Sequence, residues 1–269
     1  MRLARSRLLL PQLALLLAAG LAAAPLRAQS GFPVSAGPAT HTFAIFTEYS
    51  PDSSPIILGE TGQREFVTLG AMYSLPLVRK RVWEFSWAPE IRPIIAESDP
   101  VIVGDYASVC VPTTVAAIGQ PCTPMSGYYR YPHEVPAINT GQRTLDYTST
   151  IEGQTYYQDY TLFYGRRWTY AGGFSPVSFR FTFLPQRRLQ PILGFTGGFA
   201  VSPRDIPVFD SSAFNFTFSF GGGFQYWSSP THAMLFEYRI HHLSNADTGT
   251  ENPGVDSQMM YVGYEWGRR

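Results

Sequence analysis

Charged residues and long apolar runs are both scarce in this 269-residue chain. Only 15% of the residues are charged, and Lys80 is the one lysine among them. So little positive charge argues against a nucleic-acid-binding surface. After the first 28 residues, no apolar run approaches the roughly 20 residues that a transmembrane helix requires.

The first 28 residues have the composition of a secretory signal peptide. Arginines at positions 2, 5 and 7 precede the apolar run LLLPQLALLLAAGLAAA, and LRA ends at Ala28, a small residue suited to cleavage. This segment holds four of the 20 basic residues and no acid. Residues 29–269 therefore hold 16 basic and 20 acidic residues, a net charge of about −4. We expect them to form a single exported domain.

Cysteine is rare as well, with only Cys110 and Cys122. Two cysteines close together in an exported chain predict a disulfide. No histidine lies near them in the sequence, so we expect no metal site there, and no metal or organic cofactor is implied elsewhere.

What the chain has in quantity is aromatic residues that alternate with polar and small ones. In residues 214–226, phenylalanine dominates one face, while the other carries Asn, Thr, Ser, Gly and Gln. The alternation has a period of two and continues over the whole of 214–226, which is longer than the usual strand of about 5–6 residues. The same alternation recurs at 67–75, 83–90, 177–183 and 193–201.

Alternation of this kind is compatible with a soluble β-sandwich, a soluble barrel or a membrane barrel. The apolar faces are rich in aromatics, while the opposite faces hold Glu, Arg, Gln and glycine, which leaves a soluble fold with too little charge outside. An apolar-out, polar-in barrel accounts for both faces. We therefore predict an all-β fold, an eight-stranded antiparallel β-barrel of the bacterial outer membrane. The polar residues expected to fill its lumen are Glu84, Glu90, Arg180, Glu237, Arg239 and His241.

Eight strands are predicted, near 41–50, 65–76, 82–95, 175–184, 189–201, 213–227, 232–244 and 256–266. Short turns at 78–81, 185–188 and 228–231 belong on the periplasmic side of such a barrel, and the longer connections belong outside. The connection 96–174 is a long extracellular insertion. It either extends the neighbouring strands beyond the membrane or carries its own hairpin, and the sequence does not decide between these.

The segment IHHLSNADTGTENPGVD, residues 240–256, is the candidate reactive part. Counting by twos places His242 and Ser244 at the end of one strand, on the outer face. Asp256 lies at the start of the next strand, on the same face and at the same extracellular level. Alternate residues of a strand are roughly 6.5–7 Å apart, and a residue on the adjacent strand can contact the histidine from the side. Serine, histidine and carboxylate together form an activated nucleophile.

Each of these residues alone has a simpler explanation. A histidine or serine at a barrel rim is usually interfacial polarity, and Asp256 could merely begin a strand after the NPG turn. Three such residues with matching parity and height are harder to explain in this way, but the residues alone leave both catalysis and interfacial polarity open.

HLSNA followed by NPGVD, with fourteen residues from His242 to Asp256, resembles the lipid A 3-O-deacylase family (PagL-like acyloxyacyl hydrolases). The resemblance is specific over about 231–266, is weaker from about 175, and rests mainly on strand pattern over 29–174. Members are eight-stranded outer-membrane barrels that remove an ester-linked acyl chain from lipopolysaccharide.

The resemblance implies that Ser244 is the nucleophile, His242 the general base and Asn245 an oxyanion-hole residue. The family's type enzyme has glutamate where this chain has Asp256, which is one methylene shorter. Strict alternation also points Asn245 inward, so its role requires a bend in the strand.

We therefore predict an outer-membrane serine esterase with a triad of Ser244, His242 and Asp256. Its substrate would be lipid A within lipopolysaccharide, and its surroundings the outer-membrane lipids. The alternative is a non-catalytic eight-stranded barrel with a structural or anchoring role.

Overall fold

The computed structural model describes residues 41–110, 125–137, 144–151, 154–208 and 210–267. All eleven elements in these ranges are β-strands. Their bounds are β1 (Thr42–Ser50), β2 (Glu65–Arg79), β3 (Trp83–Trp87), β4 (Glu90–Cys110), β5 (Met125–Pro136), β6 (Thr144–Ile151), β7 (Gln154–Phe183), β8 (Leu189–Ile206), β9 (Ser212–Trp227), β10 (His232–Ser244) and β11 (Val255–Gly267). Within the described ranges, no helix is long and apolar enough to cross a membrane.

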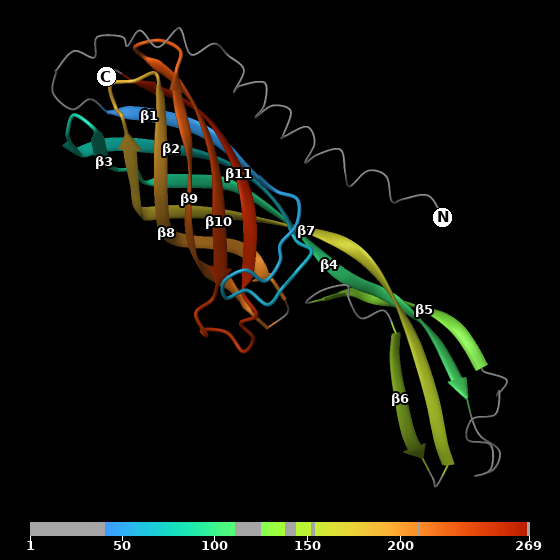
Figure 1. Cartoon of the computed structure of the whole chain (residues 1–269). Helices are drawn as coiled ribbons and strands as arrows, with labels where there is room; N and C mark the ends of the chain where they lie inside the picture. Colours follow the sequence, from blue (N-terminus) through green and yellow to red (C-terminus); the bar gives the residue numbers. More distant parts are fainter. Residues whose placement is uncertain (1–40, 111–124, 138–143, 152–153, 209, 268–269) are drawn as a thin grey trace.

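The strands form one antiparallel sheet. From β1 the order runs through β11, β10, β9 and β8 to β7, which pairs with both β3 and β4. Both of these pair with β2, and β2 pairs with β1. The first strand therefore has a neighbour on each side, and the strands curve around a common axis (Figure 1).

The predicted strand 82–95 is two strands, β3 and β4, separated at Ala88 and Pro89. Proline has no N–H to donate to the ladder, which explains an interruption at this point. One part of β2, ending at Arg79, pairs with β3, and the part beginning at Glu65 pairs with β4. The described residues thus hold eleven strands where eight were predicted, and this division accounts for one of the additional three.

The insertion 96–174 accounts for the other extra strands, and it combines the two arrangements that the sequence left open. The strands β4 and β7 run far past the rest of the sheet, and they pair with each other as far as Cys110 and Tyr157. Two further strands, β5 and β6, pair with their outer parts. Figure 1 shows this extension projecting from the end of the sheet that carries the loops 51–64 and 245–254.

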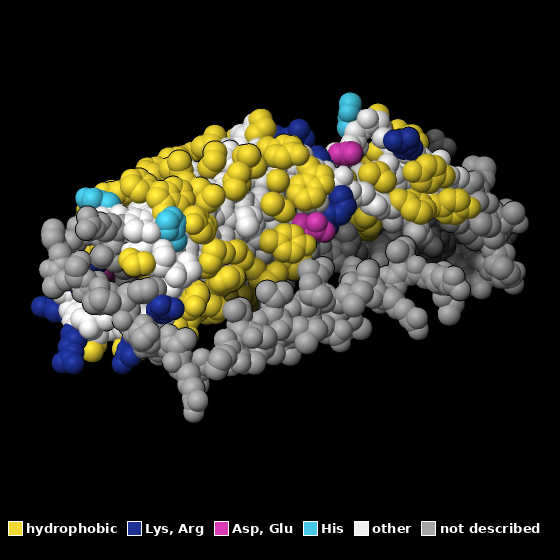
Figure 2. All heavy atoms as spheres, turned by 90° about the horizontal axis from the view of Figure 1, so that it is seen from above, with side chains coloured by type: hydrophobic (Ala, Val, Ile, Leu, Met, Phe, Trp, Pro, Cys, Tyr) yellow, Lys and Arg dark blue, Asp and Glu magenta, His cyan; other side chains and the backbone are white. Residues whose placement is uncertain are grey.

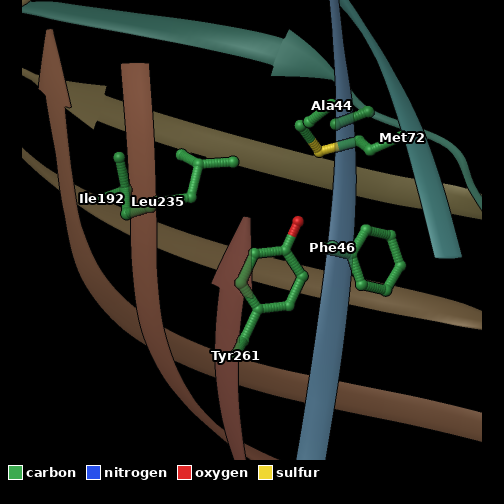
Figure 3. Packing of buried hydrophobic residues seen from close by; sticks show 7 residues of the cluster. Ala44, Phe46, Met72, Ile192, Leu235 and Tyr261 are labelled. Atoms are coloured by element: carbon green, nitrogen blue, oxygen red, sulfur yellow. The ribbon is translucent and has the colours of Figure 1, made fainter. Parts of the chain in front are cut away.

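Alternate residues face opposite sides, as the sequence pattern predicts. In β1, Phe43 and Ile45 are about half exposed, while Ala44 and Phe46 are buried. The exposed set continues around the sheet with Leu69, Leu193, Phe195, Phe216, Phe220, Tyr238, Val262 and Tyr264. Figure 2 shows hydrophobic side chains over much of the visible face, with Lys and Arg side chains gathered at one end and a few charged side chains near the middle of the view. Inside, Phe46 stacks on Tyr261, near Met72, Ile192 and Leu235 (Figure 3).

The interior also holds a network of buried ion pairs. It contains the five predicted charged residues Glu84, Glu90, Arg180, Glu237 and Arg239, together with Glu48, Arg92 and Glu265. The Arg239 guanidinium lies 3.2 Å from Glu48, 3.0 Å from Glu90 and 2.9 Å from Glu237. It also lies over the ring of Tyr261, 4.0 Å from the ring centroid. One arginine thus balances carboxylates from three strands.

We predict that Arg239→Ala strongly destabilises the fold. Removing one partner of a buried pair leaves uncompensated charge, a loss of about 3–5 kcal/mol in free energy of unfolding. Urea unfolding of the refolded protein in detergent or lipid vesicles would measure it. Glu65→Gln is the matched control, since the Glu65–Arg166 pair is partly exposed and such pairs contribute about 1 kcal/mol or less. An Arg239→Ala loss no larger than that of the control would contradict this role.

Two predictions fall outside the described residues. The signal peptide, residues 1–28, lies there entirely, as does Cys122, the second cysteine of the predicted disulfide with Cys110. Both remain predictions.

Candidate catalytic site

His242 and Asp256 face each other directly across two neighbouring strands. The register of β10 and β11 pairs these two residues. Asp256 Oδ1 lies 2.6 Å from His242 Nδ1, and both side chains are buried. The contact leaves the other ring nitrogen, Nε2, available for a proton transfer. Such a carboxylate–imidazole pair fixes the orientation of a histidine that acts as a base.

The second oxygen of the Asp256 carboxylate accepts hydrogen bonds from four consecutive backbone N–H groups. The donors are Ile56 at 2.9 Å, Ile57 at 2.5 Å, Leu58 at 3.0 Å and Gly59 at 3.0 Å. N–H groups aimed at a carboxylate stabilise its charged form. Asp256 is therefore held as a buried anion with its other oxygen directed at His242.

These donors belong to the β1–β2 loop, residues 51–64, which lies against the beginning of β11. Ser54 N donates to the carbonyl oxygen of Asp256 at 3.2 Å, and the Thr61 hydroxyl donates to that of Gly254 at 2.6 Å. Isolated bridges join Ser53 to Ser257 and Thr61 to Val255. Two segments about 200 residues apart in the sequence thus meet at the acid.

Ser244, the last residue of β10, is two residues beyond His242 on the same strand face. Its Oγ donates a hydrogen bond to Asn252 Oδ1 at 3.0 Å and accepts one from the N–H of Ala246 at 3.1 Å. The hydroxyl therefore points to Asn252 rather than to the imidazole. Hydrogen bonds between catalytic groups are often long or misaligned before substrate binds, so this geometry does not remove Ser244 from the site.

Asn245 ends the strand instead of continuing it. Its side chain donates to the carbonyl oxygen of Glu251 at 2.8 Å and accepts from the N–H of Asp247 at 2.9 Å. Its own N–H donates to Asn252 Oδ1 at 3.2 Å. Ala246 and Asp247 follow with positive φ angles of 52° and 59°, which form the turn. The bend expected at Asn245 is present, and its amide group holds the loop together.

Phe218 forms one wall of the site. It lies opposite His242 on the neighbouring strand β9, and the two rings are 5.0 Å apart between centroids. The aromatic face therefore packs against the imidazole. In the other direction along β10, His241 faces the interior, where it lines a small cavity with Glu48 and Arg92. The adjacent histidines have opposite environments, as the alternation predicts.

The sequence predicted that His242, Ser244 and Asp256 lie together, but it suggested no role for Asn252. Nor did it predict the four N–H donors of 56–59, because backbone groups leave little trace in a sequence. The signal that could have pointed to them is the Gly59 position, where a Cβ atom would lie 2.5 Å from the N of Asp256. In the part of the chain that the structure describes, no group of three or more His, Cys, Asp or Glu side chains could hold a metal ion.

The chain matches the family model of lipid A 3-O-deacylase (PagL) over residues 127–265, just over half of its length. Among solved structures it is similar to the crystal structure of the outer membrane enzyme PagL, with 12% identity, a TM-score of 0.43, and coverage of 82% of this chain and 97% of that one. It is also similar to Neisserial surface protein A (NspA), with 10% identity, a TM-score of 0.37, and coverage of 86% and 99%. No curated protein matches.

The family match covers β5 to β11 almost completely and contains His242, Ser244 and Asp256. It confirms the resemblance that the HLSNA and NPGVD segments indicate. The chain belongs to the lipid A 3-O-deacylase (PagL) family.

Proposed function

We propose that this protein is an outer-membrane esterase that removes an ester-linked acyl chain from lipid A. The observation that carries this proposal is the buried contact between His242 and Asp256, two residues along the strand from Ser244. Membership of the lipid A 3-O-deacylase family supports the substrate class.

The proposed setting is a closed barrel that crosses the outer membrane. Its wall would consist of β1, β2, the β3–β4 pair, β7, β8, β9, β10 and β11, which gives eight positions around the ring. The exposed outer side chains are apolar and the interior holds ion pairs, the arrangement that lipid requires of a barrel. With the short turns in the periplasm, the site lies at the outer rim, where acyl chains of lipopolysaccharide meet their sugar.

In the proposed reaction, Ser244 Oγ attacks the ester carbonyl carbon while His242 Nε2 takes the hydroxyl proton. The tetrahedral intermediate then collapses: the bond to the sugar oxygen breaks, and His242 returns the proton to that oxygen. Water, deprotonated by the same histidine, then attacks the acyl-enzyme; the bond to Ser244 Oγ breaks, His242 returns the proton to that oxygen, and the fatty acid is released. Asp256 keeps the ring oriented and stabilises the imidazolium at each stage.

The proposed oxyanion donor is the backbone N–H of Asn245, which now donates to Asn252 Oδ1. That oxygen accepts hydrogen bonds from both the Ser244 hydroxyl and the Asn245 N–H. A substrate carbonyl oxygen that replaced it would meet the Asn245 N–H beside the nucleophile, as oxyanion stabilisation requires. In this proposal Asn245 contributes through its backbone, and its side chain keeps the turn in place.

One observation favours the alternative of a non-catalytic barrel, because Ser244 directs its hydroxyl to Asn252 instead of His242. Mass spectrometry of lipid A separates the two possibilities. Expression in a strain with fully acylated lipid A should produce species lighter by one acyl chain. Unchanged lipid A in cells that contain folded wild-type protein would rule out the deacylase and leave the structural role.

A further inference from the structure

We propose that residues 56–59 of the β1–β2 loop are a positioning element of the active site, and that their four N–H groups hold Asp256 where it can orient His242. This inference rests on the proposed function for its catalytic meaning, and on the contacts of Asp256 for its geometry.

The two oxygens of the Asp256 carboxylate have different partners. All four loop N–H groups donate to Oδ2, at 2.5–3.0 Å, while Oδ1 lies 2.6 Å from His242 Nδ1. Asp256 is fully buried. Successive N–H groups that converge on one point form a concave anion site. Rotation of the carboxylate away from His242 would break hydrogen bonds to this site, so the loop fixes the direction of Oδ1.

The loop is itself fastened on both sides of the N–H groups. Before them, Ser54 N bonds the carbonyl of Asp256. After them, Glu60 N bonds the carbonyl of Pro253 at 2.6 Å, and the Thr61 hydroxyl bonds that of Gly254. Farther out, the Arg166 guanidinium donates to the carbonyl of Gln63 at 2.7 Å. The donors are therefore held by contacts that do not involve the carboxylate.

Gly59 is the point at which the arrangement is most sensitive. A Cβ atom there would lie 2.5 Å from the N of Asp256, 2.9 Å from the carbonyl carbon of Val255 and 3.0 Å from Cγ of Asp256. Backbone atoms cannot move aside as a flexible side chain can, so an alanine must push the loop away from the acid. Gly62 in the same loop has no such restriction, because the nearest atom to its Cβ among the described residues would be the carbonyl oxygen of Ser53, at an ordinary contact distance of 3.6 Å.

The first test compares Gly59→Ala with Gly62→Ala in steady-state deacylation of purified lipopolysaccharide in detergent micelles. Misplacement by about 1 Å can cost about a hundredfold in rate. We expect Gly59→Ala to lower kcat roughly ten- to a hundredfold with KM nearly unchanged, and Gly62→Ala to match wild type. Equal kcat values for the two folded variants would overturn the proposal. So would a rise in KM alone, since that would assign the loop to substrate binding.

The second test requires no enzymatic activity, because it measures the contact between the N–H groups of 56–59 and Asp256 directly. Amide hydrogen exchange followed by mass spectrometry should show slow exchange at 56–59 in the wild type and fast exchange in Asp256→Ala. Equal exchange in both proteins would overturn the proposal even if the enzyme is active. Protection that depends on Asp256 in a wild type that leaves lipid A intact would instead reject the proposed function and retain the holding contact.

Discussion

Ser244→Ala is expected to abolish deacylation and to leave the fold intact. Loss of a serine nucleophile from a triad reduces kcat by about 10⁴- to 10⁶-fold, because the covalent acyl-enzyme can no longer form. Among the described residues, the hydroxyl makes two hydrogen bonds, to Asn252 and from Ala246, and both lie at the end of β10. Lipid A from cells that express the variant should keep every acyl chain by mass spectrometry, whereas wild type should remove one.

Ser257→Ala is a suitable control for this experiment. Ser257 is a buried serine close to the site, and it lies beside Asp256 on the opposite face of β11, so its hydroxyl has no part in the proposed reaction. It should deacylate as wild type does. Deacylation by Ser244→Ala at the wild-type rate would contradict the assigned nucleophile, although not the esterase itself.

The geometry of the His242–Asp256 pair could be predicted from the sequence because a strand has a period of two. Once the strands near 232–244 and 256–266 are placed beside each other, antiparallel pairing leaves few registers that keep both apolar faces outward. The observed register brings His242 opposite Asp256. The same alternation predicted that His241 faces the interior, and it predicted five of the charged residues found there.

Other features were not predicted from the sequence. Glu48, Arg92 and Glu265 complete the interior network, and the first of them lies on the buried face of β1, where alternation could have predicted it. The division at Pro89 and the strands within 96–174 depend on backbone donors and on long-range pairing, which side-chain patterns report poorly. The N–H groups of 56–59 are the clearest case: they act without their side chains, on a residue about 200 positions away.

Those N–H groups also matter for one difference between this chain and the type enzyme that it resembles. The type enzyme has glutamate at the position of Asp256. An aspartate has one methylene less with which to reach across the strand pair. Here the register places Asp256 directly opposite the histidine, and the β1–β2 loop fills the space behind the carboxylate. The short side chain is therefore matched to its surroundings, and both carboxylate oxygens are engaged.

Asp256→Glu is accordingly expected to be less active than wild type. An added methylene in this buried site must displace the carboxylate from the N–H groups or press it into His242, and overpacking of this kind costs about 1–3 kcal/mol. Where that strain turns the His242 ring away from its catalytic orientation, kcat drops roughly ten- to a hundredfold. Kinetics on purified lipopolysaccharide would measure it beside Asp256→Asn, which keeps the size but removes the charge, and Asp256→Ala, which removes both.

The three variants separate the effect of side-chain length at position 256 from the effect of its charge. Asp256→Asn and Asp256→Ala should each lose about 10⁴-fold, as other triads do when the acid is replaced, so that glutamate lies between them and wild type. If Asp256→Glu equals or exceeds wild type, the site has room for the longer side chain and the close match between aspartate and loop is wrong. If Asp256→Ala is as active as wild type, the carboxylate has no catalytic part, and the buried contact with His242 serves the fold alone.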